Sequence, residues 1–285
     1  MAKMDGRKVA GEVLDSLYHE VNRMKLDHIH PKLAVVLVGN DPASLSYIRQ
    51  KQKACDKTGI EWEQFDYPED VTTEELIGKI NDLNEDDSIH GILVQLPLPK
   101  HIFTPNVIKA IKPAKDVDGF TAYNLGKMLV SKDFEHLAPC TPKGVIKMLD
   151  FYNVDVQGKE VVVVGHSNIV GKPLSMMLLN RNATVTTCHV HTKDLMMHTR
   201  RADILCVAVG KAGLITAEMV KDGAVVVDIG VNRTEEGKLV GDCDYKEISK
   251  KAAYITPVPG GAGPMTVACL MENTVTAAKR IHNYK

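Results

Sequence analysis

Two side chains in the first part of the sequence could together hold a substrate and move a proton. Tyr47 and Lys51 are spaced i and i+4, so a helix would place both on one face. A lysine can transfer protons if burial lowers its pKa. A solvated lysine beside a half-buried tyrosine fits the same spacing, and the pattern leaves this alternative open. A short-chain dehydrogenase, which also carries Y-x-x-x-K, is disfavoured because its pair follows the nucleotide-binding loop, whereas here the pair precedes it.

Gln95 and Asp118 lie where ligands commonly bind. Gln95 falls near the expected carboxyl end of a buried strand, and a buried amide needs hydrogen-bond partners. Those partners could simply be backbone groups. Asp118 belongs to the segment K-D-V-D-G and could equally be a turn residue, because Asp-Gly favours tight turns. The pattern alone leaves both roles open.

The clearest binding motif is the segment 161–173, V-V-V-V-G-H-S-N-I-V-G-K-P. A buried strand ends at Gly165, and after a short loop Gly171 precedes Pro173, which is expected at the first position of a helix. Backbone N–H groups and a helix N-terminus attract a phosphate. The spacing G-x-S-x-x-x-G differs from the G-x-G-x-x-G fingerprint, and an ordinary strand-to-helix turn is the alternative. We favour nucleotide binding because the loop opens a half of the chain in which strands and helices alternate.

The next expected strand, 184–188, should end near the adenosine ribose of a bound dinucleotide. NAD sites often have Asp or Glu there, whereas this strand ends in C-H-V-H-T. The lack of an acid removes a repulsion to a 2′-phosphate and leans slightly toward NADP. However, this strand end has no Arg to bind that phosphate, so the choice between NADP and NAD stays open.

Alternating helices and strands must position these residues. The segment 256–266, T-P-V-P-G-G-A-G-P-M-T, is expected to be irregular because of its Gly and Pro content. Repeated β-α alternation predicts an α/β fold with a parallel, doubly wound sheet. Strands are expected at 33–38, 60–67, 91–96, 161–164, 184–188, 204–209, 224–229 and 254–256, and helices at 8–25, 42–59, 72–83, 141–151 and 267–282, with a short one from 104.

The composition is that of an ordinary globular protein, and the length predicts two domains, with one large domain as the alternative. The chain has 285 residues, 44% hydrophobic and 25% charged, with a formal net charge of −1. This excludes a disordered chain and gives no basic excess that would attract nucleic acid. We expect no membrane span and no signal peptide. The six cysteines lack metal-binding spacing, so we expect reduced thiols, no metal site and a cytoplasmic protein.

Taken together, these segments resemble the bifunctional methylenetetrahydrofolate dehydrogenase/cyclohydrolase family over almost the whole chain. The matching segments, in order, are YIRQKQKACDKTGI, GILVQLPLP, KPAKDVDGF, PCTPKGVIKML, VVVVGHSNIVGKP, ATVTTCH, DIGVNR and TPVPGGAGPMT. The resemblance implies a folate-binding catalytic domain formed by 1–140 and 264–285. It implies a Rossmann-type NAD(P)-binding domain formed by 141–263, a homodimer, a folate substrate and the cofactor NADP.

The resemblance also implies two reactions. The first oxidises 5,10-methylenetetrahydrofolate to 5,10-methenyltetrahydrofolate and passes a hydride to nicotinamide, and the second hydrolyses the methenyl compound to 10-formyltetrahydrofolate. Lys51 would assist proton transfer around the attacking water, and Gln95 would help to set the protonation of Lys51. Tyr47 would stack on the folate, and Asp118 would accept hydrogen bonds from the pterin ring. Further folate contacts are implied at Val94, Leu96, Pro259, Gly260, Gly261, Pro264 and Thr266, and cofactor contacts at Gly165, His166, Ser167, Gly171, Val190 and Val231.

Two positions depart from the commoner pattern of that family. Its loop usually reads G-R-S, whereas here His166 stands in place of the Arg, and Val190 stands where a Ser or Arg is common. Both positions usually help to hold the 2′-phosphate, and an Arg offers a charged fork that a mostly neutral His lacks. We hypothesise that this protein discriminates NADP from NAD less than its relatives do, or even prefers NAD. His191 or Lys193 could compensate.

Three other functions are alternatives to the bifunctional enzyme. They are a dehydrogenase-only relative, a non-catalytic folate- or nucleotide-binding protein, and a Rossmann enzyme that acts on a small hydroxy acid. The joint presence of Tyr47, Lys51, Gln95 and Asp118 speaks against the first two. The third leaves the segment T-P-V-P-G-G-A-G-P-M-T without an explanation.

Overall fold

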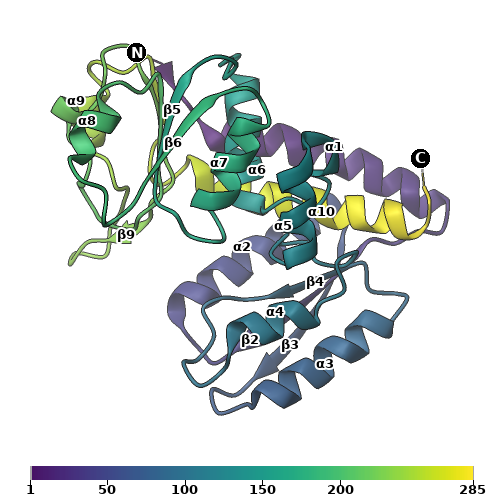
Figure 1. Ribbon diagram of the computed structural model, residues 1–285. Helices are drawn as coiled ribbons and strands as arrows, with labels where there is room; N and C mark the ends of the chain where they lie inside the picture. Colours follow the sequence, from purple (N-terminus) through teal and green to yellow (C-terminus); the bar gives the residue numbers. More distant parts are fainter. Residues whose placement is uncertain (1, 285) are drawn as a thin grey trace. The chain divides into compact units, whose positions relative to one another are not determined.

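The computed structural model describes residues 2–284 and shows the predicted alternation of helices and strands (Figure 1). The chain divides into two compact units. Unit 1 comprises Met1–Ala10, Met128–Phe134 and Thr141–Thr266, and unit 2 comprises Gly11–Lys127, Glu135–Cys140 and Val267–Lys285. The functional assignment of a catalytic and a nucleotide-binding domain to the expected ranges stays a prediction. Within residues 2–284, no helix combines the length and apolarity that crossing a bilayer requires.

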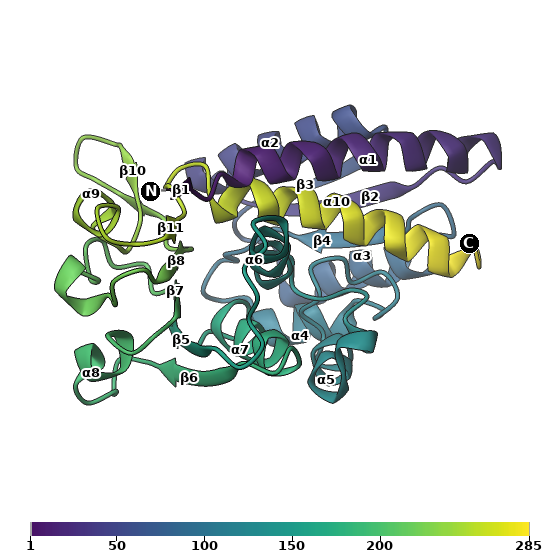
Figure 2. The same cartoon turned by 90° about the horizontal axis from the view of Figure 1, so that it is seen from above.

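Unit 2 is built on a parallel sheet of three strands, β2 (Lys32–Val38), β3 (Glu61–Tyr67) and β4 (Gly91–Val94), in the spatial order β3-β2-β4. The helices α2 (Pro42–Thr58), α3 (Thr73–Glu85) and α4 (Thr104–Ala110) connect and follow these strands. The central strand β2 is buried from its second residue onward, as its continuous apolar run predicts. One face packs against apolar residues of α3 and α4, and Figure 2 shows α2 on the other side of the strands.

Local capping residues set the ends of α2 and α3. Asp41 precedes α2 and accepts a hydrogen bond from the backbone N–H of Ser44, while Gly59 ends the helix with φ +77°. The hydroxyl of Thr72 accepts a hydrogen bond from the backbone N–H of Glu75, whose carboxylate accepts one from Thr72 in return. The predicted bounds of both helices are confirmed to within two residues because these caps are local in sequence.

Unit 1 contains a six-stranded sheet in the spatial order β1-β11-β8-β7-β5-β6, and every neighbouring pair is parallel. From β5 the chain places the next strand, β6, on one side and the following strand, β7, on the other. Order reversal of this kind creates a crevice at the carboxyl ends of β5 and β7. The strands are β1 (Ala2–Lys3), β5 (Glu160–Val164), β6 (Thr184–Cys188), β7 (Ile204–Val207), β8 (Val225–Asp228) and β11 (Tyr254–Ile255).

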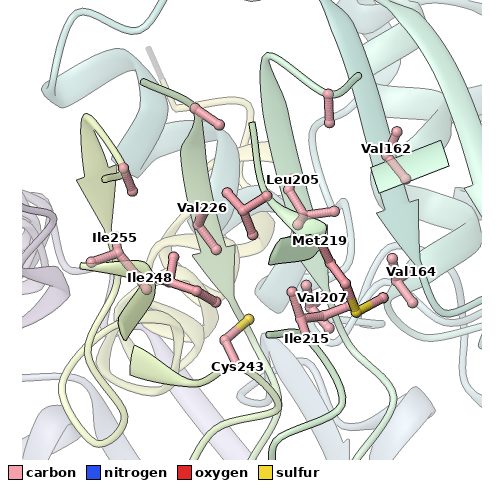
Figure 3. Close-up of a cluster of buried hydrophobic side chains, with 14 of the residues drawn as sticks. Val162, Val164, Leu205, Val207, Ile215, Met219, Val226, Cys243, Ile248 and Ile255 are labelled. Carbon is pink, nitrogen blue, oxygen red and sulfur yellow. The ribbon is translucent and has the colours of Figure 1, made fainter. Parts of the chain in front are cut away.

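Alternate residues of this sheet form a buried apolar cluster on one face (Figure 3). Val162 and Val164 of β5, and Leu205 and Val207 of β7, share this face because side chains alternate along a strand. Connecting segments, including α8 (Leu195–Thr199) and α9 (Tyr245–Ile248), cover the cluster from above the sheet. The predicted α/β fold with parallel sheets is confirmed.

The long helices α1 (Gly6–Leu26) and α10 (Ala262–Ile281) each have residues in both units. The expectation that 256–266 is irregular throughout was wrong, because α10 begins at Ala262. Pro264 is tolerated there because the first turn of a helix needs no N–H from it. The expectation that Pro173 starts a helix was also wrong, since α7 (Gly171–Leu179) begins two residues earlier.

Several short elements had not been expected from the sequence. They include the edge strand β1 and the antiparallel pair formed by β9 and β10. Two-residue strands carry too few residues for a periodic pattern to stand out. The remaining elements are α5 (Ala122–Val130), α6 (Cys140–Phe151), β9 (Asn232–Arg233), β10 (Leu239–Val240) and two short 3₁₀ helices, Lys132–Phe134 and Ala217–Met219.

A buried histidine in unit 2 is held in its neutral form. Nδ1 of His90 accepts a hydrogen bond from the backbone N–H of Lys32 at 3.1 Å, so this nitrogen carries no proton. Its Nε2 lies 2.9 Å from Nε2 of His282 and therefore donates to it. Burial, reinforced by the positive charge that His282 would carry, lowers the pKa of His90 to about 4.

This histidine is expected to make the fold sensitive to acid. Because the folded pKa of His90 lies below that of an unfolded histidine, the unfolded state takes up the proton first as the pH falls from about 6.5 to about 4. The free energy of unfolding should fall by about 2 kcal/mol between about pH 7.5 and about pH 5 on this account. Denaturant titrations of the wild type and of His90→Asn measure it. An equal fall in the free energy of unfolding at acid pH in both proteins would contradict the attribution of this fall to His90.

Candidate active site

A buried lysine and a buried amide meet in unit 2. Lys51 lies on the inward face of α2, and its Nζ donates a hydrogen bond of 2.8 Å to Oε1 of Gln95. Gln95 follows β4 directly, and its Nε2 donates at 2.6 Å to the carbonyl oxygen of Leu96. Its backbone N–H donates to Val36 of the neighbouring strand. The amide is therefore held from both sides and presents its oxygen to the lysine.

The surroundings of Lys51 favour its neutral form more than water does. Loss of solvation lowers the pKa of Lys51, and the negative charge of Asp118 and the thiol of Cys140 oppose this shift. Burial in turn raises the pKa of Asp118 to about 6, against the opposing effect of Lys51. Lys51 and Asp118, which carry opposite charges when ionised, therefore lie near each other in a poorly solvated environment. Such perturbed pairs are typical of sites that move protons.

Asp116 builds the loop that carries Asp118. Its Oδ1 accepts hydrogen bonds from the backbone N–H groups of Gly119 and Phe120, and its Oδ2 accepts from Thr121 and from the side-chain amide of Asn124. Each of these four bonds is between 2.8 and 3.2 Å long. Asp116 therefore makes the turn, and none of these four bonds uses the carboxylate of Asp118, a half-buried residue.

Asn273 of α10 braces the same region from a distant part of the sequence. Its side-chain amide donates to the carbonyl oxygens of Val117 at 2.8 Å and Ala138 at 2.9 Å. These carbonyls neighbour Asp118 and the segment that leads to Cys140. The sequence indicated Asp116 as a possible turn residue of K-D-V-D-G, and the structure assigns it that role. Sequence reasoning missed Asn273, because no local signal pointed to it.

The structure brings together some of the predicted folate-binding residues. Tyr47 lies on α2 one turn before Lys51, and the residue is 37% exposed. Val94 is the buried last residue of β4 and Leu96 is half-buried next to Gln95. These residues share unit 2 with Asp118.

The predicted folate-binding residues from Pro259 to Thr266 lie in unit 1. Gly260 adopts φ +114°, and the backbone N–H of Gly6 donates a hydrogen bond to its carbonyl. The hydroxyls of Thr266 and Thr141 are hydrogen-bonded at 2.8 Å. Pro264 and Gly261 flank the start of α10. Their contact with the folate stays a prediction.

The predicted nucleotide loop lies at the crevice between β5 and β7. Gly165 adopts φ +122°, and a Cβ there would clash with the carbonyl oxygen of Ala208, which follows β7. A Cβ on Gly171 would clash with the carbonyl of Gly165. The hydroxyl of Ser167 accepts hydrogen bonds from the backbone N–H groups of Val170 and Gly171. Two glycines thus permit a tight turn that leaves 166–169 exposed at the strand ends.

These residues fit a dinucleotide. The loop 166–169 is exposed, it leads into α7, and it occupies the place where the strand order reverses. Val190 is 84% exposed after β6, and Val231 is 45% exposed after β8, so both can contact a ligand at this edge.

Three histidines gather at the carboxyl ends of β5 and β6. The ring centre of His166 lies 5.0 Å from that of His189, which lies 6.0 Å from that of His191. Sequence reasoning had not placed His189 in the site. Within residues 2–284, no group of three or more His, Cys, Asp or Glu side chains has a geometry that could hold a metal ion. The cluster stands where the ribose of a dinucleotide is expected.

Comparisons with known proteins identify the family. Residues 4–118 match the family model of the tetrahydrofolate dehydrogenase/cyclohydrolase catalytic domain, and residues 139–282 match that of its NAD(P)-binding domain. The bifunctional protein FolD of Nautilia profundicola is 54% identical over 279 residues, which are 98% of each chain.

Two solved structures are similar over nearly their whole length. The bifunctional FolD of Campylobacter jejuni has a TM-score of 0.95 at 48% identity, covering 98% of this chain and 99% of that one. The Trypanosoma brucei enzyme, solved with NADP cofactor and an inhibitor, has a TM-score of 0.95 at 37% identity, covering 98% of each. The chain therefore belongs to the tetrahydrofolate dehydrogenase/cyclohydrolase family.

Proposed function

We propose that this protein oxidises 5,10-methylenetetrahydrofolate to the 5,10-methenyl compound and hydrolyses that product to 10-formyltetrahydrofolate. The observation that carries the proposal is the buried contact of 2.8 Å between Lys51 and Gln95, with Asp118 close enough to oppose the pKa shift of Lys51. Membership of the family supports it. A dehydrogenase-only function is disfavoured because the groups needed for hydrolysis are present together.

In the hydrolysis, water adds to the methenyl carbon, a C–O bond forms, and the water gives up a proton. Neutral Lys51 can take that proton, since burial lowers its pKa and Gln95 fixes the position of its Nζ. The hydroxyl of the adduct then loses its proton to solvent and becomes the formyl C=O as one ring C–N bond breaks, and protonated Lys51 returns its proton to the departing nitrogen. Asp118 stabilises the charged lysine between these steps and accepts hydrogen bonds from the pterin.

In the oxidation, the protein orients the folate and the cofactor, and no side chain has to act as an acid or a base. A bound nicotinamide would supply the hydride acceptor. The exposed loop 166–169, which includes His166 and Ser167, would hold the phosphates through its backbone N–H groups at the start of α7, in a turn that Gly165 and Gly171 permit. Tyr47 and Asp118 would fix the folate, so that the bridge carbon is held at reacting distance. No side chain has to move a proton in this half of the reaction.

The experiment that tests the proposal follows both reactions in the purified protein. Methylenetetrahydrofolate is supplied with NADP+ or NAD+, and reduced nucleotide and the methenyl intermediate are measured together. Methenyltetrahydrofolate is supplied separately without a nucleotide. We expect nucleotide reduction in the first assay and hydrolysis in the second. Hydrolysis without any reduction would mean that the 165–173 loop does not bind a working cofactor.

We propose NADP as the cofactor, with a weaker preference over NAD than in relatives that carry Arg at the position of His166. An arginine offers two charge-assisted hydrogen bonds to a 2′-phosphate, and Val190 offers none. The neighbouring rings of His189 and His191 could donate one hydrogen bond each, which supports partial compensation.

Restoring the arginine is expected to restore the preference. His166→Arg should tighten NADP+ binding by about tenfold or more and leave NAD+ binding within about twofold, because only NADP+ carries the new partner. Calorimetric titration with both nucleotides measures this. Gln157→Arg is the matched control, because this substitution introduces the same side chain at an exposed position. Gln157 precedes the amino end of β5, whereas His166 follows its carboxyl end. Unchanged NADP+ affinity in His166→Arg would refute the proposal.

We also propose a homodimer and a cytoplasmic location. All six cysteines are buried and none forms a disulfide among the residues that the structure describes, which supports a reducing compartment. The descriptions of the two matching family models support a catalytic role for the first part of the chain and nucleotide binding for 141–263. Sedimentation of the purified protein tests the dimer.

A further inference from the structure

A fully buried carboxylate ties together two loops at the nucleotide end of unit 1. Oδ2 of Asp242 accepts hydrogen bonds from the backbone N–H groups of Val209 at 2.8 Å and Gly210 at 3.0 Å. Its Oδ1 accepts from the backbone N–H of Lys211 at 2.8 Å and from the side-chain amide of Asn232 at 2.9 Å. Three consecutive backbone donors thus converge on one side chain whose residue is 0% exposed.

Both of these loops border the predicted dinucleotide crevice. The first follows β7, and Ala208, the residue before it, packs so closely on Gly165 that a Cβ on that glycine would clash with its carbonyl. The second follows β8 and contains Val231, an exposed residue expected to contact the cofactor. The side chain of Asp242 joins these two segments through its hydrogen bonds to 209–211 and to Asn232.

The backbone at Asp242 is held in place by Asp228, the last residue of β8. The backbone N–H groups of Asp242 and Cys243 donate to Asp228 at the end of β8, at 3.0 and 2.9 Å. The side chain of Cys243 points into the buried apolar cluster (Figure 3). Gly230 and Gly241 have no room for a Cβ, because one would collide with Asp242 and Asp228, respectively. The carboxylate is therefore a fixed part of the fold and not a mobile surface group.

The side of the crevice on which Asp242 acts follows from the strand order. The adenosine half of a dinucleotide lies toward β6, and the nicotinamide half lies on the other side of the switch point, toward β7 and β8. The loops held by Asp242 follow β7 and β8. We propose that Asp242 is a positioning residue for the nicotinamide half of the cofactor, which it serves by fixing the backbone of 209–211 and the side chain of Asn232.

This inference rests on the proposed function, and its test separates the two. Asp242→Asn keeps the size of the side chain but replaces one acceptor oxygen by a donor, so some of the four bonds are lost. We expect NADP+ to bind about tenfold more weakly in calorimetry. Adenosine 2′,5′-bisphosphate, which lacks the nicotinamide half, should bind as in the wild type. Hydrolysis of methenyltetrahydrofolate, which needs no nucleotide, should also be unchanged.

Two further variants make the experiment decisive. Asp203→Asn is the matched control, because Asp203 precedes the opposite end of β7 and accepts hydrogen bonds from Glu160 and Lys221. Its NADP+ affinity should equal that of the wild type. Asn232→Ala removes a single bond to Asp242 and should weaken NADP+ by about threefold. It decides the matter if Asp242→Asn does not fold.

Each outcome of these titrations either supports or overturns the proposed role of Asp242. Loss of NADP+ affinity with retained bisphosphate affinity supports the proposal. Unchanged NADP+ affinity in both Asp242→Asn and Asn232→Ala overturns it. Equal losses for NADP+, the bisphosphate and hydrolysis would mean a purely structural role and also overturn it. A wild type that binds neither NADP+ nor NAD+ would instead refute the proposed function.

Discussion

A Lys51→Met variant is expected to hydrolyse 5,10-methenyltetrahydrofolate about a hundredfold to ten-thousandfold more slowly than the wild type. The methionine fills a similar volume but cannot accept or return a proton. The oxidation of methylenetetrahydrofolate should fall much less, because hydride transfer needs no proton carrier. The variant should therefore accumulate the methenyl intermediate, which is released instead of being hydrolysed. Absorbance of that intermediate during turnover with NADP+ measures the effect.

The control for this variant lies on the same helix. Lys53→Met makes the same substitution at an exposed position two residues away and should leave both rates unchanged. Proportional loss of both activities in Lys51→Met would argue that Lys51 only supports the fold. Loss of hydrolysis alone would tie Lys51 to proton transfer.

The pattern of α2 already contained the information that Lys51 is unusual. The buried positions of this helix include Ser44, Ile48, Cys55 and Thr58, and Lys51 falls on the same stripe. A lysine on a buried stripe must find a partner or lose its charge. The spacing relative to Tyr47 suggested proton chemistry. The partner Gln95 could not be identified from spacing, because it comes from another strand of the sheet.

In the K-D-V-D-G loop, the sequence alone could not show which of the two aspartates forms the turn and which lies near Lys51. Asp116 and Asp118 are both residues that favour turns, and either could have been the turn-forming carboxylate. The structure assigns four hydrogen bonds to Asp116 and leaves Asp118 near Lys51. The deciding contacts depend on how the loop packs against Asn273, which is far along the chain.

Secondary structure was predictable wherever the signal was local. Asp41 and Gly59 mark the ends of α2, and Thr72 with Glu75 marks the start of α3. Prediction failed at the start of α10, because a run rich in Gly and Pro hides a first turn that needs no N–H from Pro264. The strand β1 was missed because its two residues become a strand only by pairing with β11.

An Asp118→Asn variant is expected to impair both reactions, unlike Lys51→Met. The amide keeps the shape and one acceptor but loses the negative charge that faces the pterin and Lys51. Hydrogen bonds to charged groups contribute about 1.5–3 kcal/mol, so KM for the folate should rise by about tenfold to a hundredfold in oxidation and hydrolysis alike. Steady-state kinetics with each folate measures the rise. Asp82→Asn, an exposed carboxylate on α3, is the control and should leave both KM values unchanged.

The same variant should also shift the pH dependence of hydrolysis, and the sign of that shift is fixed by the charges. Asp118 raises the pKa of Lys51 against the larger lowering caused by burial. Removing its charge therefore lowers the pKa of Lys51 further, and the neutral lysine persists to lower pH. The ascending limb of the hydrolysis profile should move to lower pH in Asp118→Asn. A shift to higher pH, or none at all, would mean that Asp118 does not act on Lys51 and that its contribution is confined to holding the folate.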